Sequence, residues 1–370
     1  MGKFANGLCL GLLVCLMAAG SAFAGQTINV GTSPSGVTLL DQNNSSITLK
    51  LDIGTIDFSN VSTRDGDFTM MTIDGFSRSH RIGEPALPMI GKLISIPFGC
   101  DLQTKVVSSK STEISLASLG ISTPLMPVQP SLSKSVDPST VPFEYNRNLY
   151  AQAGYYTLPQ AESRVDGVMR GVRLGLVSIA PVEYDPIKNS IRVYSEMVVT
   201  ITFEHADWAT TEMNWRKGYS PYFEPIEGRV INYRAQTSTL KSDDLVKYPV
   251  KYLIISDRMF EAQLQPFIEW KTKKGFTVQT AYTDVIGTTN TAIKSYIQSV
   301  YNAGTPEDPP PSFVLLVGDA QQIPPFAGSA GSHVTDLRFC EFTNDNYPEI
   351  YYGRFSAQNP AQLQPQIDKT

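Results

Sequence analysis

The sequence predicts two regions with different folds: a β-rich amino-terminal region and, after it, an α/β region built on a parallel sheet. Three observations predict this division. Short runs of alternating apolar and polar residues, separated by turn residues, occupy positions 26–203. From position 249 onward, continuous apolar runs alternate with segments of helical apolar spacing. Glycine contributes 27 and proline 25 of the 370 residues, which suits a chain with many turns.

In the β-rich region, strands are expected where the alternation is clearest. Residues 47–53 alternate as a half-buried strand should, and residues 92–97 form another short β-prone run. Residues 172–179 and 191–203 flank a turn-rich segment, which predicts a long hairpin. Residues 124–150 are rich in proline and serine and lack periodicity, so an extended, exposed loop is expected there.

The α/β region is expected to order its elements as β-α-β-α-β, which predicts a parallel sheet covered by helices on both faces. Gly275 follows the first helical pattern as a C-cap, and Thr289 precedes the second as an N-cap. The predicted elements are, in order, a strand at 250–256, a helix at 259–274, a strand at 277–282, a helix at 289–300 and a strand at 313–319.

Two further segments complete the organisation. Residues 224–248 are polar and lack a pattern, so they are expected to form an exposed linker, where proteolysis concentrates. Asn359 and Pro360 begin another helical pattern, which continues to the last residue, Thr370, without a C-cap. A sheet of three or four strands followed by such a helix is expected to be part of a larger domain.

Composition excludes several classes of protein. Hydrophobic residues make up 42% of the chain and aromatic residues 10%, which is enough to build packed cores and excludes a wholly disordered chain. The formal net charge is −5, and no block of lysine and arginine stands out. Binding to the phosphate backbone of nucleic acids is therefore not expected.

The first 24 residues have the pattern of a secretory signal peptide. Lys3 supplies the positive start, residues 8–19 form an apolar run, and Ala22 and Ala24 give the small-x-small motif before a cleavage point. Cleavage after Ala24 and export to the cell surface or medium are expected. The apolar run is too short to cross a bilayer, and no later segment is long and apolar enough to do so. A lipoprotein attached through Cys15 is disfavoured, because the residue before it is not small.

Cysteine and histidine usage argues against two kinds of site. Without the signal peptide only Cys100 and Cys340 remain, so no disulfide framework is expected. The histidines are far apart in the sequence and no CxxC motif occurs, which argues against a local zinc site. His333 and Cys340 are the closest imidazole–thiol pair, but Cys340 lies in an apolar, aromatic run. It is predicted to be a buried structural residue rather than a nucleophile.

One acidic residue and one acidic segment are candidate ligand sites. Asp319 directly follows a predicted parallel strand, where ligand-binding groups gather in open α/β sheets, although a turn or helix-capping role would give the same pattern. Asp345, Asn346 and Glu349 supply closely spaced hard oxygen donors, and the Tyr347 carbonyl could join them. Calcium prefers such irregular acidic loops. The spacing is not that of an EF-hand, and a solvated Asn/Asp turn is the alternative.

Several segments resemble the gingipain family. The first group is similar to the gingipain pro-domain and the second to the first half of the gingipain catalytic domain. The first comprises residues 125–138, 169–173, 180–185 and 219–224, and the second residues 270–275, 287–290, 315–319, 344–349 and 353–355. Gingipains are secreted bacterial cysteine endopeptidases of caspase-like fold that are made as zymogens. The resemblance is greatest to their lysine-specific members.

The resemblance implies a signal peptide at 1–24, a sandwich-like β-rich pro-domain at 25–223 and a linker and processing segment at 224–248. It implies that residues 249–370 are the amino-terminal part of a caspase-like peptidase domain. The family's catalytic histidine and cysteine lie beyond the last residue of this chain. The chain is therefore expected to be the amino-terminal portion of a zymogen that cleaves protein substrates after basic residues, chiefly lysine, and to be inactive as it stands. The alternative is a non-catalytic secreted inhibitor or binding module. A generic surface adhesin has no repeat in its favour.

The resemblance also implies a structural calcium site. It assigns the side chains of Asp319, Asp345 and Glu349 as ligands, together with the carbonyl groups of Phe342 and Tyr347. A divalent cation would balance the three carboxylates, which would otherwise repel one another.

The last expectations concern latency and maturation. Lys134 is the single basic residue in segment 124–142. We expect it to occupy the primary specificity pocket of the complete enzyme, in an intramolecular contact between pro-domain and peptidase domain. An ordinary surface lysine is the alternative. A cut after Arg229 or Arg234 would separate the two regions, and Arg234 is preferred because residues 231–234 match the family junction.

Overall fold

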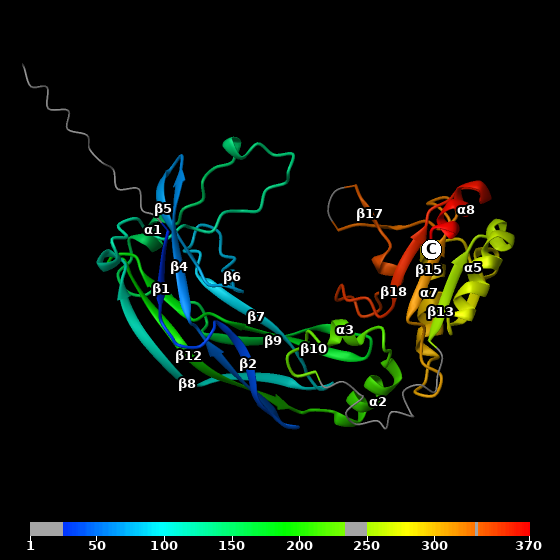
Figure 1. The fold of residues 1–370 in the computed structure, drawn as a ribbon, viewed down its shortest axis with the longest axis horizontal. Coiled ribbons are helices and arrows are strands. Elements are labelled where there is room, and N and C mark those ends of the chain that lie inside the picture. The colour runs from blue at the N-terminus through cyan, green and yellow to red at the C-terminus, as the bar shows by residue number, and fades with distance from the viewer. Residues whose placement is uncertain (1–24, 234–249, 330–331) are drawn as a thin grey trace, which may run out of the picture.

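The computed structural model describes residues 25–233, 250–329 and 332–370 (Figure 1). The predicted signal peptide with its cleavage point at Ala24, and the processing site at Arg234, lie outside the described residues. The β-rich region and the α/β region are both present, in the predicted order. Each described helix is too short or too polar to cross a membrane.

Antiparallel strands build the β-rich region. They form a sheet of order β1-β4-β5, a second of order β6-β7-β10-β9, and a third of order β11-β12-β3-β2 in which β8 also pairs with β12. The strands are β1 (Gln26–Asn29), β2 (Gly36–Gln42), β3 (Ser46–Asp52), β4 (Thr55–Thr63), β5 (Gly66–Thr72), β6 (Ser77–Arg78), β7 (Pro88–Ser95), β8 (Asp101–Ser115), β9 (Ala161–Met169), β10 (Val172–Ile179), β11 (Val182–Asp185) and β12 (Ser190–Glu204).

Strand β12 organises the core of this region. It pairs with β3 along one edge and with the long strand β8 along the other. Its side chains alternate between the core and the opposite face, and Val199 and Ile201 are fully buried against the buried leucines of β3. Such alternation is what an antiparallel sheet with one face in the core requires.

The prediction that residues 172–179 and 191–203 pair as one hairpin is wrong. Strand β10 pairs with β7 and β9, whereas β12 pairs with β11 across the turn. Pro181 stands between β10 and β11, and it lacks the N–H that a continuing ladder would need. The chain passes there from one sheet to another, so the two apolar runs belong to different sheets.

The α/β region has a parallel sheet of order β14-β13-β15-β18, as its pattern predicts. Helix α7 covers one face and helices α5 and α8 the other, each with its own cluster of buried side chains. The elements are β13 (Lys251–Ser256), α5 (Glu261–Lys273), β14 (Thr277–Tyr282), α6 (Thr283–Ile286), α7 (Asn290–Asn302), β15 (Phe313–Val317), β16 (Phe326–Ala327), β17 (Val334–Thr335), β18 (Tyr351–Phe355) and α8 (Pro360–Asp368).

The first part of the expected linker is folded rather than exposed. Helix α2 (Trp208–Gly218) is followed by α3 (Glu224–Glu227), and Val230 is only 3% exposed. The Ile231 N–H donates to the Leu93 carbonyl at 3.0 Å, and the Asn232 side chain pairs with the backbone of Ser95. Local polarity predicted an exposed segment because these partners in β7 are more than 130 residues away in the sequence.

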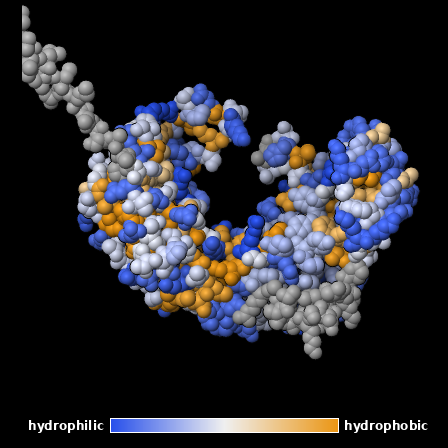
Figure 2. All heavy atoms as spheres, in the orientation of Figure 1, coloured by the Kyte–Doolittle hydropathy of each residue, from blue (hydrophilic) through white to orange (hydrophobic). Residues whose placement is uncertain are grey.

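The two regions meet at one end of the α/β sheet and diverge from there. Away from this junction, the β-rich region and the α/β region are separated by an opening, which the space-filling view also shows (Figures 1 and 2). At the junction, Met169, Val172 and Phe223 of the β-rich region pack with Tyr347 and Tyr351 of the α/β region. This mixed apolar cluster joins the two regions without a continuous sheet.

The core of the β-rich region yields a first prediction. Replacing Ile201 with alanine should lower the free energy of unfolding by about 2–5 kcal/mol, because it removes buried methyl groups and leaves a cavity. Denaturant titration of residues 25–370 measures this. The control is Ile187→Ala, which makes the same change at a side chain that is 59% exposed. Equal losses for the two variants would contradict the assignment of β12 to the core.

Candidate functional site

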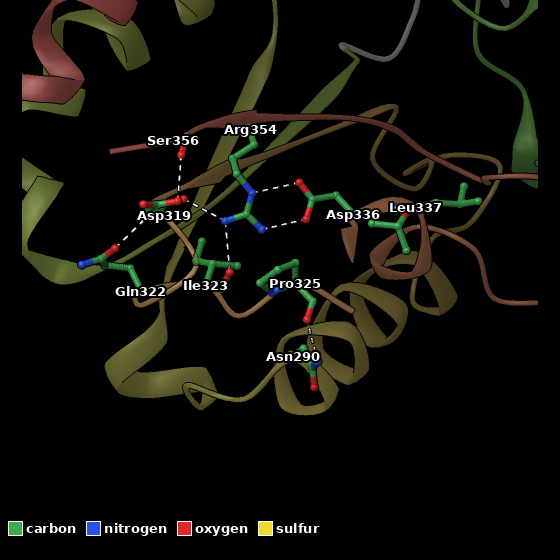
Figure 3. A network of polar contacts seen from close by, with 11 residues as sticks. Asn290, Asp319, Gln322, Ile323, Pro325, Asp336, Leu337, Arg354 and Ser356 are labelled. Carbon is green, nitrogen blue, oxygen red and sulfur yellow. Dashed lines mark hydrogen bonds and ion pairs between the residues drawn. The ribbon is translucent and has the colours of Figure 1, made fainter. Parts of the chain in front are cut away.

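Asp319 lies two residues after the end of β15, at the carboxyl edge of the parallel sheet (Figure 3). Its carboxylate accepts hydrogen bonds from Gln358 Nε2 at 2.8 Å and Ser356 Oγ at 3.0 Å. The bond from Gln358 is the main cause that holds the pKa of Asp319 below its ordinary value. The carboxylate is ionised and is already engaged by the segment that follows β18.

Arg354 links the neighbouring loops at this edge of the sheet. Its guanidinium forms a two-point ion pair with Asp336, with Nε–Oδ2 and Nη2–Oδ1 distances of 2.8 and 2.7 Å. It also donates from Nη1 to the carbonyls of Gly318 and Ile323 (Figure 3). This geometry joins the loops after β15 and β17 to strand β18, and so gives Arg354 a structural role.

The acidic loop, residues 341–349, lies at the amino end of β18. Glu349 is 2% exposed, and its Oε2 accepts a hydrogen bond from the Phe342 N–H at 2.9 Å. The Thr343 hydroxyl lies 2.7 Å from Asp345 Oδ2 and 3.1 Å from Glu349 Oε1. Asn344 and Asn346 have left-handed φ values of 60° and 71°, which asparagine tolerates and which let the loop turn tightly.

Acidic side chains lie close together in this loop. Burial raises the pKa of Glu349 to about 7, and the nearby Asp345 carboxylate adds to that rise. Glu341, which is 7% exposed, accepts a hydrogen bond from the Asp345 N–H at 3.1 Å. A single Thr343 hydroxyl can donate its proton to only one of the two carboxylates that it touches. Asp345 and Glu349 therefore share the Thr343 hydroxyl, and each also accepts backbone N–H groups.

The five residues expected to bind calcium do not all converge. Asp345 and Glu349 lie together with the backbone of Phe342, but Asp319 is at the opposite end of the sheet. Strands β15 and β18 are parallel, with Phe313 opposite Tyr351. Glu349 precedes β18 and Asp319 follows β15, so roughly five residues at about 3.3 Å each separate the two levels.

Within the described ranges, no group of three His, Cys, Asp or Glu side chains is arranged to hold a metal. Sequence reasoning missed Glu341, which borders the loop. Its position between Cys340 and Phe342 in an apolar run carried no ligand signal.

Cys340 lies in the core, as the sequence predicts, and His333 lies at the surface. Cys340 is fully buried in the cluster of the α7 face, and burial raises the pKa of its thiol well above the ordinary value. His333 is exposed. A protonated thiol in an apolar core is a poor nucleophile, so neither residue is a candidate for covalent catalysis.

Lys134 is exposed on the predicted extended loop, and both ends of that loop are fastened. Before it, the Met126 N–H donates to the Thr69 carbonyl at 2.8 Å. The Gln129 side chain then closes the base of the loop, since it donates to the Glu144 carbonyl at 2.7 Å and accepts from the Glu144 N–H at 3.0 Å. Arg64 contacts the carbonyls of Ser139 and Val141 on the returning side.

Arg229 is exposed, but the peptide bond that follows it lies in a folded turn. The Val230 N–H donates to the Glu227 carbonyl at 2.9 Å, and the Val230 side chain is buried. A protease would have to unfold this turn before it could cut after Arg229.

The acidic loop also contacts the β-rich region. Asp345 Oδ2 accepts a hydrogen bond from the Val168 N–H in β9 at 2.6 Å, and the Tyr347 hydroxyl donates to Asp166 Oδ2 at 2.5 Å. A side chain at Gly167 would place its Cβ only 2.6 Å from the Asp345 carboxylate. Glycine at this position therefore allows the loop to approach the strand closely.

Comparison with known proteins agrees with this architecture. The family described as Propeptide_C25 matches residues 26–217, and the family described as Peptidase family C25 matches residues 246–370. Lys-gingipain HG66 of Porphyromonas gingivalis is 36% identical over 316 residues, covering 85% of this chain and 18% of the relative. Gingipain R1 of the same organism is 26% identical over 376 residues, covering 100% of this chain and 21% of the relative.

Two solved structures are also similar. A structure of gingipain K from Porphyromonas gingivalis, described as giving insight into zymogenic latency, has 31% identity and a TM-score of 0.47. The match covers 50% of this chain and 100% of that one. A complex of the RgpB pro- and mature domains has 22% identity and a TM-score of 0.43, with 52% and 95% covered.

The chain spans about a fifth of the length of the Lys-gingipains that it matches. The propeptide match covers more than half of the chain, and the peptidase match covers the α/β region. The chain therefore belongs to peptidase family C25 and comprises a propeptide region and part of a peptidase domain.

Proposed function

We propose that this chain is the amino-terminal portion of the zymogen of an exported bacterial cysteine endopeptidase that cleaves protein substrates after basic residues, chiefly lysine. The single observation that carries the proposal is the loop of Lys134: one exposed basic side chain on an extended segment fastened at both ends. A peptidase that cuts after a basic residue can be blocked by such a residue presented from its own propeptide. Fastening the loop lowers the entropy lost when it binds.

We propose that neither Cys100 nor Cys340 is the catalytic thiol of the peptidase. Cys100 and Cys340, the cysteines that the structure describes, are both buried, and burial raises the pKa of each thiol. Export is proposed to use residues 1–24 as a signal peptide cleaved after Ala24, which would deliver the protein to the cell surface or medium.

We also propose that the acidic loop binds calcium. Asp345 and Glu349 would hold the ion with their carboxylates, and the carbonyl groups of Phe342 and Tyr347 would complete the oxygen donors. The support is chemical: two carboxyl groups meet at one hydroxyl, and burial raises the pKa of Glu349, so its charged form would be favoured by a bound cation. Calcium would supply the missing positive charge and a structural link, not a step of catalysis.

The loop of Lys134 yields the second prediction. A propeptide of residues 25–233 carrying Lys134→Ala should inhibit a mature lysine-specific gingipain at least about 30-fold less tightly than the parent, because a pocket-filling anchor contributes about 2 kcal/mol or more. Lys134→Arg should transfer inhibition toward an arginine-specific gingipain. Inhibition constants from steady-state kinetics measure both effects.

Lys110→Ala is the matched control for this prediction, because it removes a lysine whose side chain is 73% exposed on strand β8 of the same region. Circular dichroism verifies that each propeptide is folded. Unchanged inhibition by Lys134→Ala would favour the ordinary surface lysine and remove the main support for lysine specificity.

Calcium dependence is the third prediction. Calcium at about 100 times its dissociation constant should stabilise residues 25–370 by about 2.7 kcal/mol, and a chelator should reverse this. Asp345→Asn and Glu349→Gln should remove the calcium-dependent rise in melting temperature. Asp319→Asn, at the other edge of the sheet, should keep it. Titration calorimetry and thermal unfolding test this, and a response lost only in Asp319→Asn would refute the acidic loop as the site.

Processing yields the fourth prediction. Limited digestion of residues 25–370 with trypsin should cut after Arg234 before it cuts after Arg229, because the turn that contains Val230 is folded and its side chain is buried. Amino-terminal sequencing of the first product should begin at Ala235. Arg234→Gln should remove this product, while Arg229→Gln should leave it unchanged. A first product that begins at Val230 would contradict the prediction.

A further inference from the structure

The hairpin between β9 and β10 turns through an unusual pair of residues. Met169 and Val172 face each other, so the turn consists of Arg170 and Gly171 alone. Their φ values are +46° and +84°, and positive values at both positions are the mark of a type I′ turn. Asparagine and glycine favour the first position of such turns, whereas arginine is strained there. Strained backbone conformations cluster at functional sites and contacts.

Arg170 is also buried, which is unusual for the tip of a hairpin. It is 1% exposed, and its guanidinium reaches into the peptidase region. Nη1 donates to the carbonyls of Pro311 at 2.7 Å and Glu349 at 3.1 Å. Nη2 donates to the Pro310 carbonyl at 2.9 Å and to Ser312 Oγ at 3.1 Å. The remaining donor, Nε, has no hydrogen-bond partner among the described residues.

The receiving surface suits a guanidinium group. Residues 309–311 are three consecutive prolines, which lack N–H groups, so this stretch presents carbonyl acceptors without competing donors. The guanidinium is a planar fork of five donors and can satisfy several such carbonyls at once, which an ammonium group cannot match. On its other side the guanidinium carbon lies 4.8 Å from the centre of the Phe223 ring.

Within the propeptide region, helix α2 packs against the turn that carries this arginine. A side chain at Gly171 would place its Cβ 2.3 Å from the Asn214 carbonyl oxygen, and one at Gly218 would lie 2.1 Å from the Arg170 carbonyl oxygen. Helix α2 therefore packs directly on the turn, and both glycines are needed for that contact. Ser220, just beyond α2, contacts Ser312 Oγ at 2.8 Å and so continues the same surface.

We propose that the carbonyls of Pro310, Pro311 and Glu349, with the Ser312 hydroxyl, form a guanidinium-binding site of the peptidase region, and that Arg170 binds it as a latch that holds the propeptide. The latch lies at the amino edge of the parallel sheet, because Ser312 and Glu349 precede β15 and β18. It is thus a second attachment, separate from the loop of Lys134.

Other contacts between the two regions flank the latch. Lys217 Nζ donates to the Asn302 carbonyl at 2.9 Å, and the contacts of Asp345 with Val168 and of Tyr347 with Asp166 lie on the side of the acidic loop. Central buried anchors ringed by contacts that exclude water carry most of the affinity at protein interfaces. Arg170 is buried and donates four hydrogen bonds, so we assign it as the central anchor of this interface.

The test uses residues 25–370 with the recognition sequence of a site-specific protease placed between residues 236 and 242. After cleavage, the propeptide and peptidase pieces of the parent should stay together. The decisive variant is Arg170→Asn, because asparagine suits the left-handed turn while it removes the guanidinium. It should weaken the affinity between the two pieces at least about 30-fold, as loss of a hot-spot anchor does. Size-exclusion chromatography and surface plasmon resonance measure this.

Two further variants sharpen the test. Arg170→Lys keeps the positive charge but not the planar fork, and should also weaken the affinity at least about tenfold. Arg216→Ala removes an arginine that is 55% exposed on α2 and should leave the affinity unchanged. Circular dichroism and thermal unfolding of the uncut chains confirm that each variant folds.

Parent-like affinity in Arg170→Asn would overturn the latch. Parent-like affinity in Arg170→Lys would overturn the guanidinium site, because charge alone would then suffice. The inference rests on family membership and not on peptidase activity. No readout measures catalysis, so failure of the latch and failure of the proposed lysine specificity are distinguishable.

Discussion

The shared direction of the strands in the α/β sheet is the constraint on which the functional layout depends. Because β13, β15 and β18 are all parallel, the sheet has one edge where strands begin and another where they end. The hairpin of β9 and β10, the acidic loop and the proline run all gather at the first edge. Asp319, Asp336 and Arg354 gather around the second.

This polarity separates the junction with the propeptide from the carboxyl edge of the sheet. The apolar junction and the Arg170 contacts use only the amino edge. The β-rich region then curves away from the α/β region (Figure 1). Ligand-binding groups in open α/β sheets lie at the carboxyl ends of strands. An attachment at the amino edge therefore holds the propeptide without occupying that end.

Buried charge is concentrated where the two regions touch. Arg170 and Glu349 are both almost fully buried, yet the contact between them is from the guanidinium to the Glu349 carbonyl rather than to its carboxylate. Burial lowers the pKa of Arg170 to about 10 and raises that of Glu349 to about 7, so each charged form is disfavoured by its surroundings.

Local pattern was sufficient for much of this protein. Alternation in residues 47–53 predicted β3, and the β-α-β-α-β order predicted a parallel sheet with two covered faces. The N-caps were also readable: Thr289 and Asn359 accept hydrogen bonds from the N–H groups of Ala292 and Gln362. These features depend on neighbours within a few residues, and short-range spacing carries that information.

The tertiary structure alone decided which distant groups meet. It assigned β10 and β12 to different sheets, bonded residues 231 and 232 to β7, and placed Asp319 and Glu349 at opposite edges. It also took Arg170, which appears in the sequence as an ordinary charged turn residue, into a site made by residues 140 and 179 positions away. Strand pairing and burial depend on partners remote in the chain, and no local periodicity encodes them.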